Sequence, residues 1–352
     1  MSDRVSIAID VMGGDLGLHA ILPASIAALA SKKNLFLFLC GDTAAISLYL
    51  DSNPVSKDCL ARVKLVDARS VVAMDEKASY SLRHRRDSSM YIALSLVRDG
   101  VVQACVSAGN TGVLMAMSCL LIKTIDGISR PAIVASLPTM KGHCTVLDLG
   151  ANINCKALNL FQFAVMGSAL ASGVFGVKNP KVGLLNIGSE LNKGLEPVRE
   201  AGEMLQAQSG INYRGFIEGD DVYAGKMDVI VCDGFAGNIL LKTSEGLAKF
   251  INFKVAKNLK KSLFRRFLTW MAGSVLLEIR EQLDPARRNG AVLLGLRAVV
   301  VKSHGAANQK SFENAINQAA VAIHCDLPNM IERGMKKEQA IVGSTVNQSP
   351  KN

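Results

Sequence analysis

The chain has 352 residues, of which 49% are hydrophobic and 20% charged; this supplies a sizeable core and excludes a disordered chain. The length predicts about two domains or one large α/β domain. A net charge of +10 favours anionic partners, whereas an aromatic content of 5% argues against a base-stacking nucleic-acid surface.

Short β-branched runs alternate with longer helical patterns. Strands are predicted at Ser6–Asp10, Leu35–Gly41, Val63–Asp67, Gln103–Ala108, Ala132–Pro138, Thr145–Leu149, Val182–Ile187, Tyr213–Ile217, Val229–Cys232 and Val299–Lys302. Helices are predicted near residues 19–31, 87–99, 111–122, 157–175, 194–208, 237–260 and 308–325. This alternation predicts a mostly parallel sheet with helices on both faces.

One domain is expected to cover residues 1–345, with a helical amphipathic extension near 250–282 and a polar tail at 346–352. Eight cysteines are scattered without a C-x-x-C pair, which favours buried, reduced thiols in a cytosolic protein. Asp10 and Asp15 interrupt the apolar stretch after Met1, so no signal peptide is expected. No uninterrupted apolar run approaches the ~20 residues of a membrane span.

Glycine and small polar residues follow six of the predicted strands. Because the carboxyl ends of parallel strands meet at one edge of a sheet, we expect the six loops to lie together, where ligands bind. Glycines and helix N-termini expose N–H groups to anions, so the set predicts a phosphate-type site. An ordinary tight turn is the alternative at any single loop. The loops follow Asp10, Ala108, Leu149, Ile187, Cys232 and Lys302.

Standard nucleotide and hydrolase motifs are absent. There is no G-x-x-x-x-G-K-[ST] and no G-x-S-x-G, and the glycines of Gly13–Gly17 do not have G-x-G-x-x-G spacing. No His, Asp and Glu cluster has metal-ligand spacing. ATP hydrolysis and dinucleotide binding are therefore disfavoured, and no metal or cofactor is expected.

Several segments in a fixed order carry a family resemblance. They read AIDVMGGD (8–15), SLR (81–83), RRDSSM (85–90), SAGNTG (107–112), RPA (130–132), LDLGAN (147–152), GLLNIG (183–188), DGFAGN (233–238) and LGL (294–296) through VKSHG (301–305). Nearly end to end, the chain resembles the bacterial phosphate acyltransferases. Val11 stands where that family usually has Ala, and Leu18 where it usually has Pro, which bears on the shape of the first loop.

The resemblance implies a three-layer α/β/α sandwich similar to phosphotransacetylases and isopropylmalate dehydrogenases, and a homodimer. It implies transfer of a fatty acyl group from acyl carrier protein to inorganic phosphate. The acyl phosphate would serve a membrane glycerol 3-phosphate acyltransferase in phospholipid synthesis. Alternatives are a phosphotransacetylase acting on acyl-coenzyme A, an NAD-dependent dehydrogenase of the related fold, and a membrane-bound scaffold without activity.

Attack of phosphate on a thioester requires donors that hold an anion and stabilise an oxyanion, but no protein nucleophile. His304 is a candidate proton donor to the leaving thiolate. The candidate catalytic residues are Asn110, Lys302, His304, Asp233 and Asn238. The candidate substrate-binding residues are Asp10, Gly13, Gly14, Asp15, Gly109, Thr111, Gly112, Asn152 and Lys193. Helix caps, tight turns and a structural histidine are the alternatives at these positions.

A basic stretch contains Arg83, Arg85 and Arg86, which the resemblance makes candidates for binding the acidic carrier protein; solvated surface is the alternative. The residue pattern of Leu259–Leu277 predicts an amphipathic helix with apolar residues on one half of its surface and mainly Lys and Arg on the other half. It favours either peripheral contact with an anionic membrane or a core or dimer interface. The candidate membrane-contacting residues are Leu263, Phe264, Phe267, Leu268, Trp270 and Met271.

Overall fold

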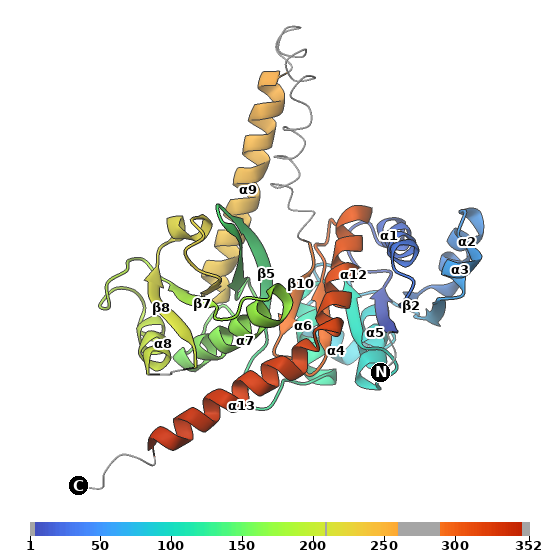
Figure 1. Ribbon diagram of the computed structural model, residues 1–352. Helices are drawn as coiled ribbons and strands as arrows, with labels where there is room; N and C mark the ends of the chain where they lie inside the picture. Colours follow the sequence, from blue (N-terminus) through green and yellow to red (C-terminus); the bar gives the residue numbers. More distant parts are fainter. Residues whose placement is uncertain (1–3, 208–209, 260–288, 347–352) are drawn as a thin grey trace.

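An 11-stranded sheet forms the centre of the molecule (Figure 1). The computed structural model describes residues 4–207, 210–259 and 289–346. The strand order is β3-β2-β1-β4-β11-β10-β5-β6-β9-β7-β8. The strands are β1 Val5–Asp10, β2 Leu35–Gly41, β3 Val63–Asp67, β4 Ala104–Ser107, β5 Ala132–Thr139, β6 Gly142–Leu147, β7 Lys181–Leu185, β8 Asn212–Ile217, β9 Val229–Val231, β10 Ala291–Leu294 and β11 Val299–Lys302.

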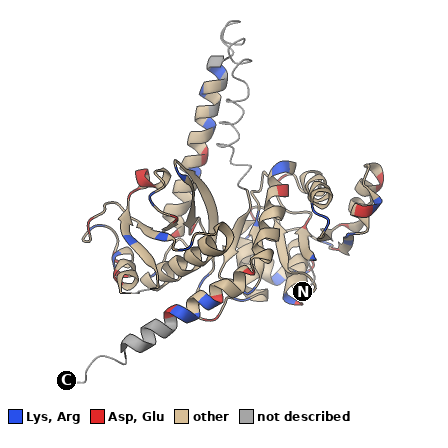
Figure 2. Cartoon of the chain, viewed as in Figure 1, with Lys and Arg blue, Asp and Glu red and all other residues tan. Residues whose placement is uncertain are grey.

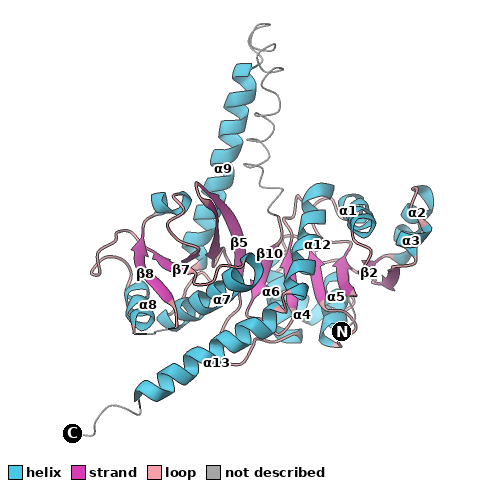
Figure 3. Ribbon diagram, in the orientation of Figure 1, coloured by secondary structure: helices cyan, strands magenta, loops and turns pink. Residues whose placement is uncertain are grey.

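Helices cover both faces of this sheet (Figure 3). The helices are α1 Leu18–Ser31, α2 Thr43–Ser52, α3 Lys57–Leu60, α4 Ala78–His84, α5 Ser89–Arg98, α6 Thr111–Leu121, α7 Ala157–Phe175, α8 Glu196–Gln206, α9 Gly234–Leu259, α12 Gln309–His324 and α13 Leu327–Val346, with a 3₁₀ turn at Gly219–Tyr223. Helices α1, α7, α8, α12 and α13 bury side chains in one apolar cluster, and α5 and α6 in another on the opposite face. The predicted three-layer α/β/α fold is confirmed.

Strand direction reverses within the sheet. Strands β1 to β4 and β11 are parallel to one another, but β10 is antiparallel to both β11 and β5, and β6 is antiparallel to β5. Strands β9, β7 and β8 continue parallel to β6. The carboxyl ends of β6, β7 and β9 therefore leave the edge of the sheet opposite to those of β1, β4 and β11.

This reversal overturns the expectation that all six loops share one edge. The hydrophobic pattern of a buried strand is the same in parallel and antiparallel pairings, so it did not reveal the direction. The short strand β10 was not predicted; it is antiparallel to both of its neighbours, and the β5–β6 hairpin completes the reversal. Helices α2, α3, α4 and α13 were also missed, and α13 extends to Val346, one residue into the predicted polar tail.

Two helices bear on membrane contact. Among the described residues, α7 is long and apolar enough to cross a membrane, but 61% of its most apolar window is buried inside the fold. It therefore packs as a core helix. Helix α9 starts at the end of β9 and projects beyond the body of the molecule (Figure 1).

Candidate functional site

Three loops meet at the carboxyl ends of β1, β4 and β11, which we call the first edge. Asp15 N donates to Gly305 O at 2.8 Å, and Ser303 N donates to Ser107 O at 2.8 Å. These bonds join the β11 loop to both others. The neighbouring order β1-β4-β11 thus brings together residues that are almost 300 positions apart in sequence.

Asp10 lies at the centre of this junction and is 1% exposed. Its carboxylate accepts hydrogen bonds from Ser89 Oγ and Ser107 Oγ, each at 2.6 Å. Burial raises the pKa of Asp10, and the two serine hydrogen bonds oppose that change. A Cβ on Gly13 would lie 2.5 Å from Asp10 Oδ2, so the β1 turn can close over this carboxylate only with glycine there. Asp10 therefore connects the end of β1 to Ser89 of α5 and Ser107 of β4 inside the junction.

Lys302 ends β11 and is 8% exposed. Its Nζ donates to Ala108 O at 3.1 Å and also to Ser303 O. Burial lowers the pKa of Lys302 to about 8, although the charges of Asp10 and Asp15 act in the opposite direction. The site thus contains a nearly buried cation whose ionisation is poised close to neutral pH.

Asn110 is the N-cap of α6. Its Oδ1 accepts from Val113 N at 3.1 Å, and its Nδ2 donates to Met74 O at 2.8 Å and Glu76 O at 3.0 Å. Both amide hydrogens are therefore committed to backbone carbonyls, which places Asn110 in a positioning role. The capping alternative is the one observed. Thr111 and Gly112 follow it as the exposed first residues of the helix, where N–H groups are available to an anion.

His304 follows Lys302 by two residues, and its side chain is exposed. Its Nδ1 accepts a hydrogen bond from Ala306 N at 3.1 Å, so the neutral ring carries its proton on Nε2. Desolvation, followed by the charge of Lys242 on α9, lowers the pKa of His304. The lowered pKa favours the neutral ring, which can donate a hydrogen bond from Nε2–H.

Asn289 holds the same loop in place. Its Oδ1 accepts from His304 N at 2.9 Å, and its Nδ2 donates to Ser303 Oγ at 2.7 Å and Ser311 O at 2.9 Å. Sequence reasoning missed Asn289, Ser89 and Ser107. Only the segments SAGNTG and RRDSSM pointed toward the two serines.

A second group of predicted residues lies at the opposite edge of the sheet. Buried Asp148 accepts from Asn152 N at 2.6 Å, Asn152 Nδ2 at 3.0 Å, Ile133 N at 2.8 Å and Ala151 N at 3.1 Å. Gly234 N donates to Asn152 O at 2.7 Å, which joins the β6 and β9 loops. Burial raises the pKa of Asp148. Asn152 is thus a buried structural link, because its amide also donates to Pro131 O at 2.8 Å.

The other predicted residues at this second edge have separate environments. Asp233 Oδ1 accepts a hydrogen bond from Ala236 N at 2.8 Å in the first turn of α9. This is the helix-capping role given above as the alternative to a catalytic role. Asn238 is exposed beside Gly150. Lys193 is exposed after β7, and its carbonyl accepts from Asn186 Nδ2 at 3.0 Å. Because of the strand reversal, the loops that carry Asn152, Asp233, Asn238 and Lys193 leave the sheet at the edge opposite the Lys302 loop. The roles of these four residues in catalysis or substrate binding stay predictions.

The basic stretch lies against the first edge. Arg85 Nε contacts Glu76 Oε1 at 3.0 Å and Oε2 at 3.1 Å, and this hydrogen bond lowers the pKa of Glu76. Since Glu76 O also accepts from Asn110, α4 is braced against the cap of α6. Arg83 and Arg86 are exposed beside it. The candidate membrane-contacting residues 263–271 lie outside the described residues.

The architecture is that of the phosphotransacetylase fold. A phosphotransacetylase from Streptococcus pyogenes superimposes with a TM-score of 0.61 at 19% identity, covering 92% of this chain and 95% of that one. A 4-hydroxythreonine-4-phosphate dehydrogenase from Klebsiella pneumoniae has a TM-score of 0.52 at 14% identity, covering 92% of this chain and 99% of its own. At these identities the likeness shows the fold alone.

The chain belongs to the fatty acid synthesis protein family, whose model matches residues 5–330. A phosphate acyltransferase from Pseudomonas putida F1 is 50% identical over 331 residues, which cover 94% of this chain and 97% of the relative. One from Stutzerimonas stutzeri is 48% identical over 340 residues, covering 96% and 94%. The protein is therefore an enzyme, an acyltransferase, as the sequence predicted.

Proposed function

We propose that the protein transfers a fatty acyl group from acyl carrier protein to inorganic phosphate. The observation that carries the proposal is Lys302, a nearly buried cation beside the exposed first turn of α6. Its ammonium has three hydrogens, and two of them are engaged by Ala108 O and Ser303 O. The third hydrogen serves an anion at the first edge.

In this reaction a phosphate oxygen attacks the thioester carbonyl, and the carbon–sulfur bond then breaks. The products are an acyl phosphate and the carrier thiol, because the departing thiolate takes up the proton that the attacking hydrogen phosphate loses. Lys302 and the N–H groups of Thr111 and Gly112 hold the phosphate, and Nε2–H of His304 donates to the oxyanion. Asp10, Asn110 and Asn289 are positioning residues that keep the three loops together.

We further propose a cytoplasmic homodimer that binds anionic membrane reversibly and consists of one domain over residues 1–345. Its acyl phosphate would be consumed by a membrane acyltransferase that acylates glycerol 3-phosphate. The described part of α9 supports an extended contact surface, because Phe235, Ile239, Phe250 and Phe253 are each at least 50% exposed. Lys residues recur along the same helix (Figure 2).

Thiol release tests the reaction directly. Hexadecanoyl–carrier protein and hexadecanoyl-coenzyme A are each incubated with the enzyme, with and without phosphate. We expect release that requires phosphate and is faster with the carrier protein. Faster release from coenzyme A would favour a phosphotransacetylase, and a folded protein with no phosphate-dependent release would favour a scaffold. Stabilisation by added NAD would instead favour a dehydrogenase.

A further inference from the structure

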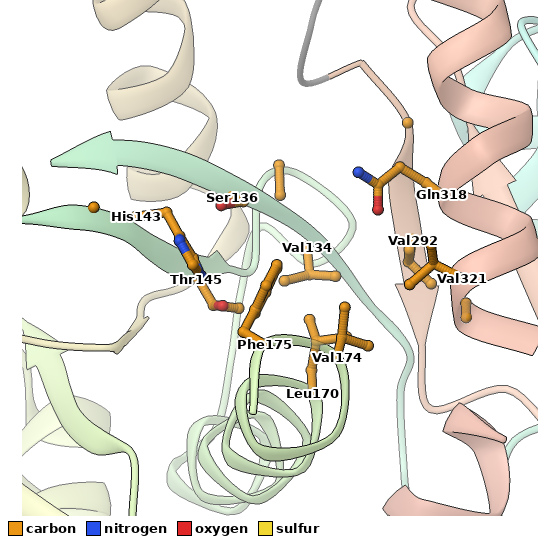
Figure 4. Close-up of a pocket in the computed structure, with 14 residues that line it drawn as sticks. Val134, Ser136, His143, Thr145, Leu170, Val174, Phe175, Val292, Gln318 and Val321 are labelled. Atoms are coloured by element: carbon orange, nitrogen blue, oxygen red, sulfur yellow. The ribbon is translucent and has the colours of Figure 1, made fainter. Parts of the chain in front are cut away.

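A cleft between α7, α12 and the β5–β6 hairpin is unused by the site described above (Figure 4). Its volume is about 380 Å³, which lies in the range of roughly 300–1,000 Å³ typical of small-molecule sites. Leu170, Val174 and Phe175 of α7 form one wall. Val292 of β10 and Val321 of α12 form the facing wall.

Most of the lining side chains are apolar, and the polar ones belong to Ser136, His143, Thr145 and Gln318. None of its 14 residues, all within the described part of the chain, is Lys, Arg, Asp or Glu. The ring of His143 packs on Phe175 with centroids 4.3 Å apart. Thr145 is 1% exposed, and its Oγ1 has no hydrogen-bond partner among the described residues. The apolar walls formed by α7, β10 and α12 suit a hydrocarbon, and the lining contains no Lys or Arg to balance the charge of a phosphate.

Part of the cleft lining lies at the first edge of the sheet. Gly290 lines it, and the next residue, Ala291, pairs with Lys302 in the sheet. The preceding residue is Asn289, which binds His304 N and Ser303 Oγ. One chain segment thus forms both the rim of the cleft and the support of the candidate site.

We propose that this cleft binds the hydrocarbon chain of the acyl substrate while the thioester remains at the Lys302–His304 loop. The inference rests on the proposed acyl transfer and adds a subsite to it. Each methylene withdrawn from water strengthens binding about fourfold. The cleft should therefore determine the preference of the enzyme for acyl chain length. Loss of a few methylene contacts should lower kcat/KM at least tenfold.

Val321→Trp tests the proposal, because Val321 is 40% exposed at the cleft and a larger side chain there can block it without disturbing the core. His324→Trp is the matched control, since it is exposed on the same helix and does not line the cleft. We expect Val321→Trp to lower kcat/KM at least tenfold with hexadecanoyl–carrier protein and less than twofold with the hexanoyl form. The control should alter neither value. Equal loss with both chain lengths would overturn the proposal.

Direct binding of a fluorescent hexadecanoic acid tests the cleft independently of the acyl-transfer reaction. Thr145→Val removes the unpartnered hydroxyl at nearly constant volume, so we expect binding equal to or tighter than wild type. Weaker binding would show that the hydroxyl contacts the carboxylate of the probe, and it would overturn the placement of the hydrocarbon chain in the cleft. If the wild-type protein binds the fatty acid and Val321→Trp abolishes this binding, but the wild type transfers no acyl group, the cleft is supported and the proposed function is rejected. Wild-type protein that binds no fatty acid, or a dimer that Val321→Trp dissociates, would reject the cleft.

Discussion

Lys302 shows how one residue links burial to chemistry. Its position at the end of β11 removes the ammonium from water, and its two carbonyl partners keep it at the first edge. Burial lowers its pKa from 10.5 to about 8, which corresponds to about 3 kcal/mol against the charged form. Such a cost is retained most readily where the charge has a function.

The first prediction concerns Lys302→Met. Between about pH 8 and 10.5 the unfolded chain holds the Lys302 proton more firmly than the folded one, so wild-type stability rises with pH there. Relative to Lys302→Met, the free energy of unfolding of wild type should increase by about 3 kcal/mol across that window. Urea titrations of both proteins at several pH values measure it, and parallel pH curves would contradict it.

The same variant should lose phosphate-dependent turnover by roughly 10²-fold, the scale of removing one anion-stabilising donor. Wild-type turnover should fall as the pH rises through about 8, since Lys302 then loses its charge. A folded Lys302→Met enzyme with near-normal turnover would remove Lys302 from the site.

At the scale of elements, α9 connects the two edges of the sheet. It begins beside Asp233 at the second edge, and yet Lys242, two turns further, influences the pKa values of both Lys302 and His304. Further along, Phe250 and Phe253 are 56% and 62% exposed. At 100° per residue Phe235, Ile239, Phe250 and Phe253 fall on one stripe. A stripe of this kind requires a partner surface.

We predict that this stripe belongs to the dimer interface. Phe250→Glu/Phe253→Glu should yield a monomer in light scattering, because burying carboxylates between the subunits is unfavourable. The comparison variant, Phe264→Glu/Phe267→Glu, should remain a dimer and lose flotation with anionic liposomes. If the first variant stays dimeric but no longer floats, the α9 stripe contacts the membrane instead.

At the scale of the molecule, the net charge of +10 and the bracing of α4 suggest where an acidic carrier protein docks. Arg85 is neutralised by Glu76, so the docking charge rests on exposed Arg83 and Arg86. Arg83 in α4 and Arg86 just beyond it are tied through Glu76 to the cap of α6, so a carrier protein docked there would lie close to the proposed phosphate site.

We predict that Arg83→Glu/Arg86→Glu raises KM for the acyl carrier substrate and leaves KM for a short acyl thioester unchanged. Rising salt should raise the wild-type KM for the carrier, since surface charges are screened over about 8 Å at physiological ionic strength. The control variant Lys33→Glu/Lys57→Glu makes the same change in charge. Its two exposed residues precede β2 and β3, at the end of these strands that lies away from the first edge. If this control has an equal effect, net charge and not a docking surface is responsible.

The amino-acid sequence by itself determined the fold class, the family and most strands, because hydrophobic periodicity and ordered motifs are local properties of the chain. It also identified Lys302, Asp10 and the α6 cap as neighbours of glycine-rich loops. Only the tertiary structure decided which loops meet. Strand β10 is antiparallel to both of its neighbours and leaves β5 parallel to β11, so it is the β5–β6 hairpin that sends the β6, β7 and β9 loops to the other edge. The direction of β6 follows from the two-residue turn of the hairpin, which permits only antiparallel pairing. The insertion of β10 between β11 and β5 depends on contacts between distant segments, so no local pattern in the sequence encodes it.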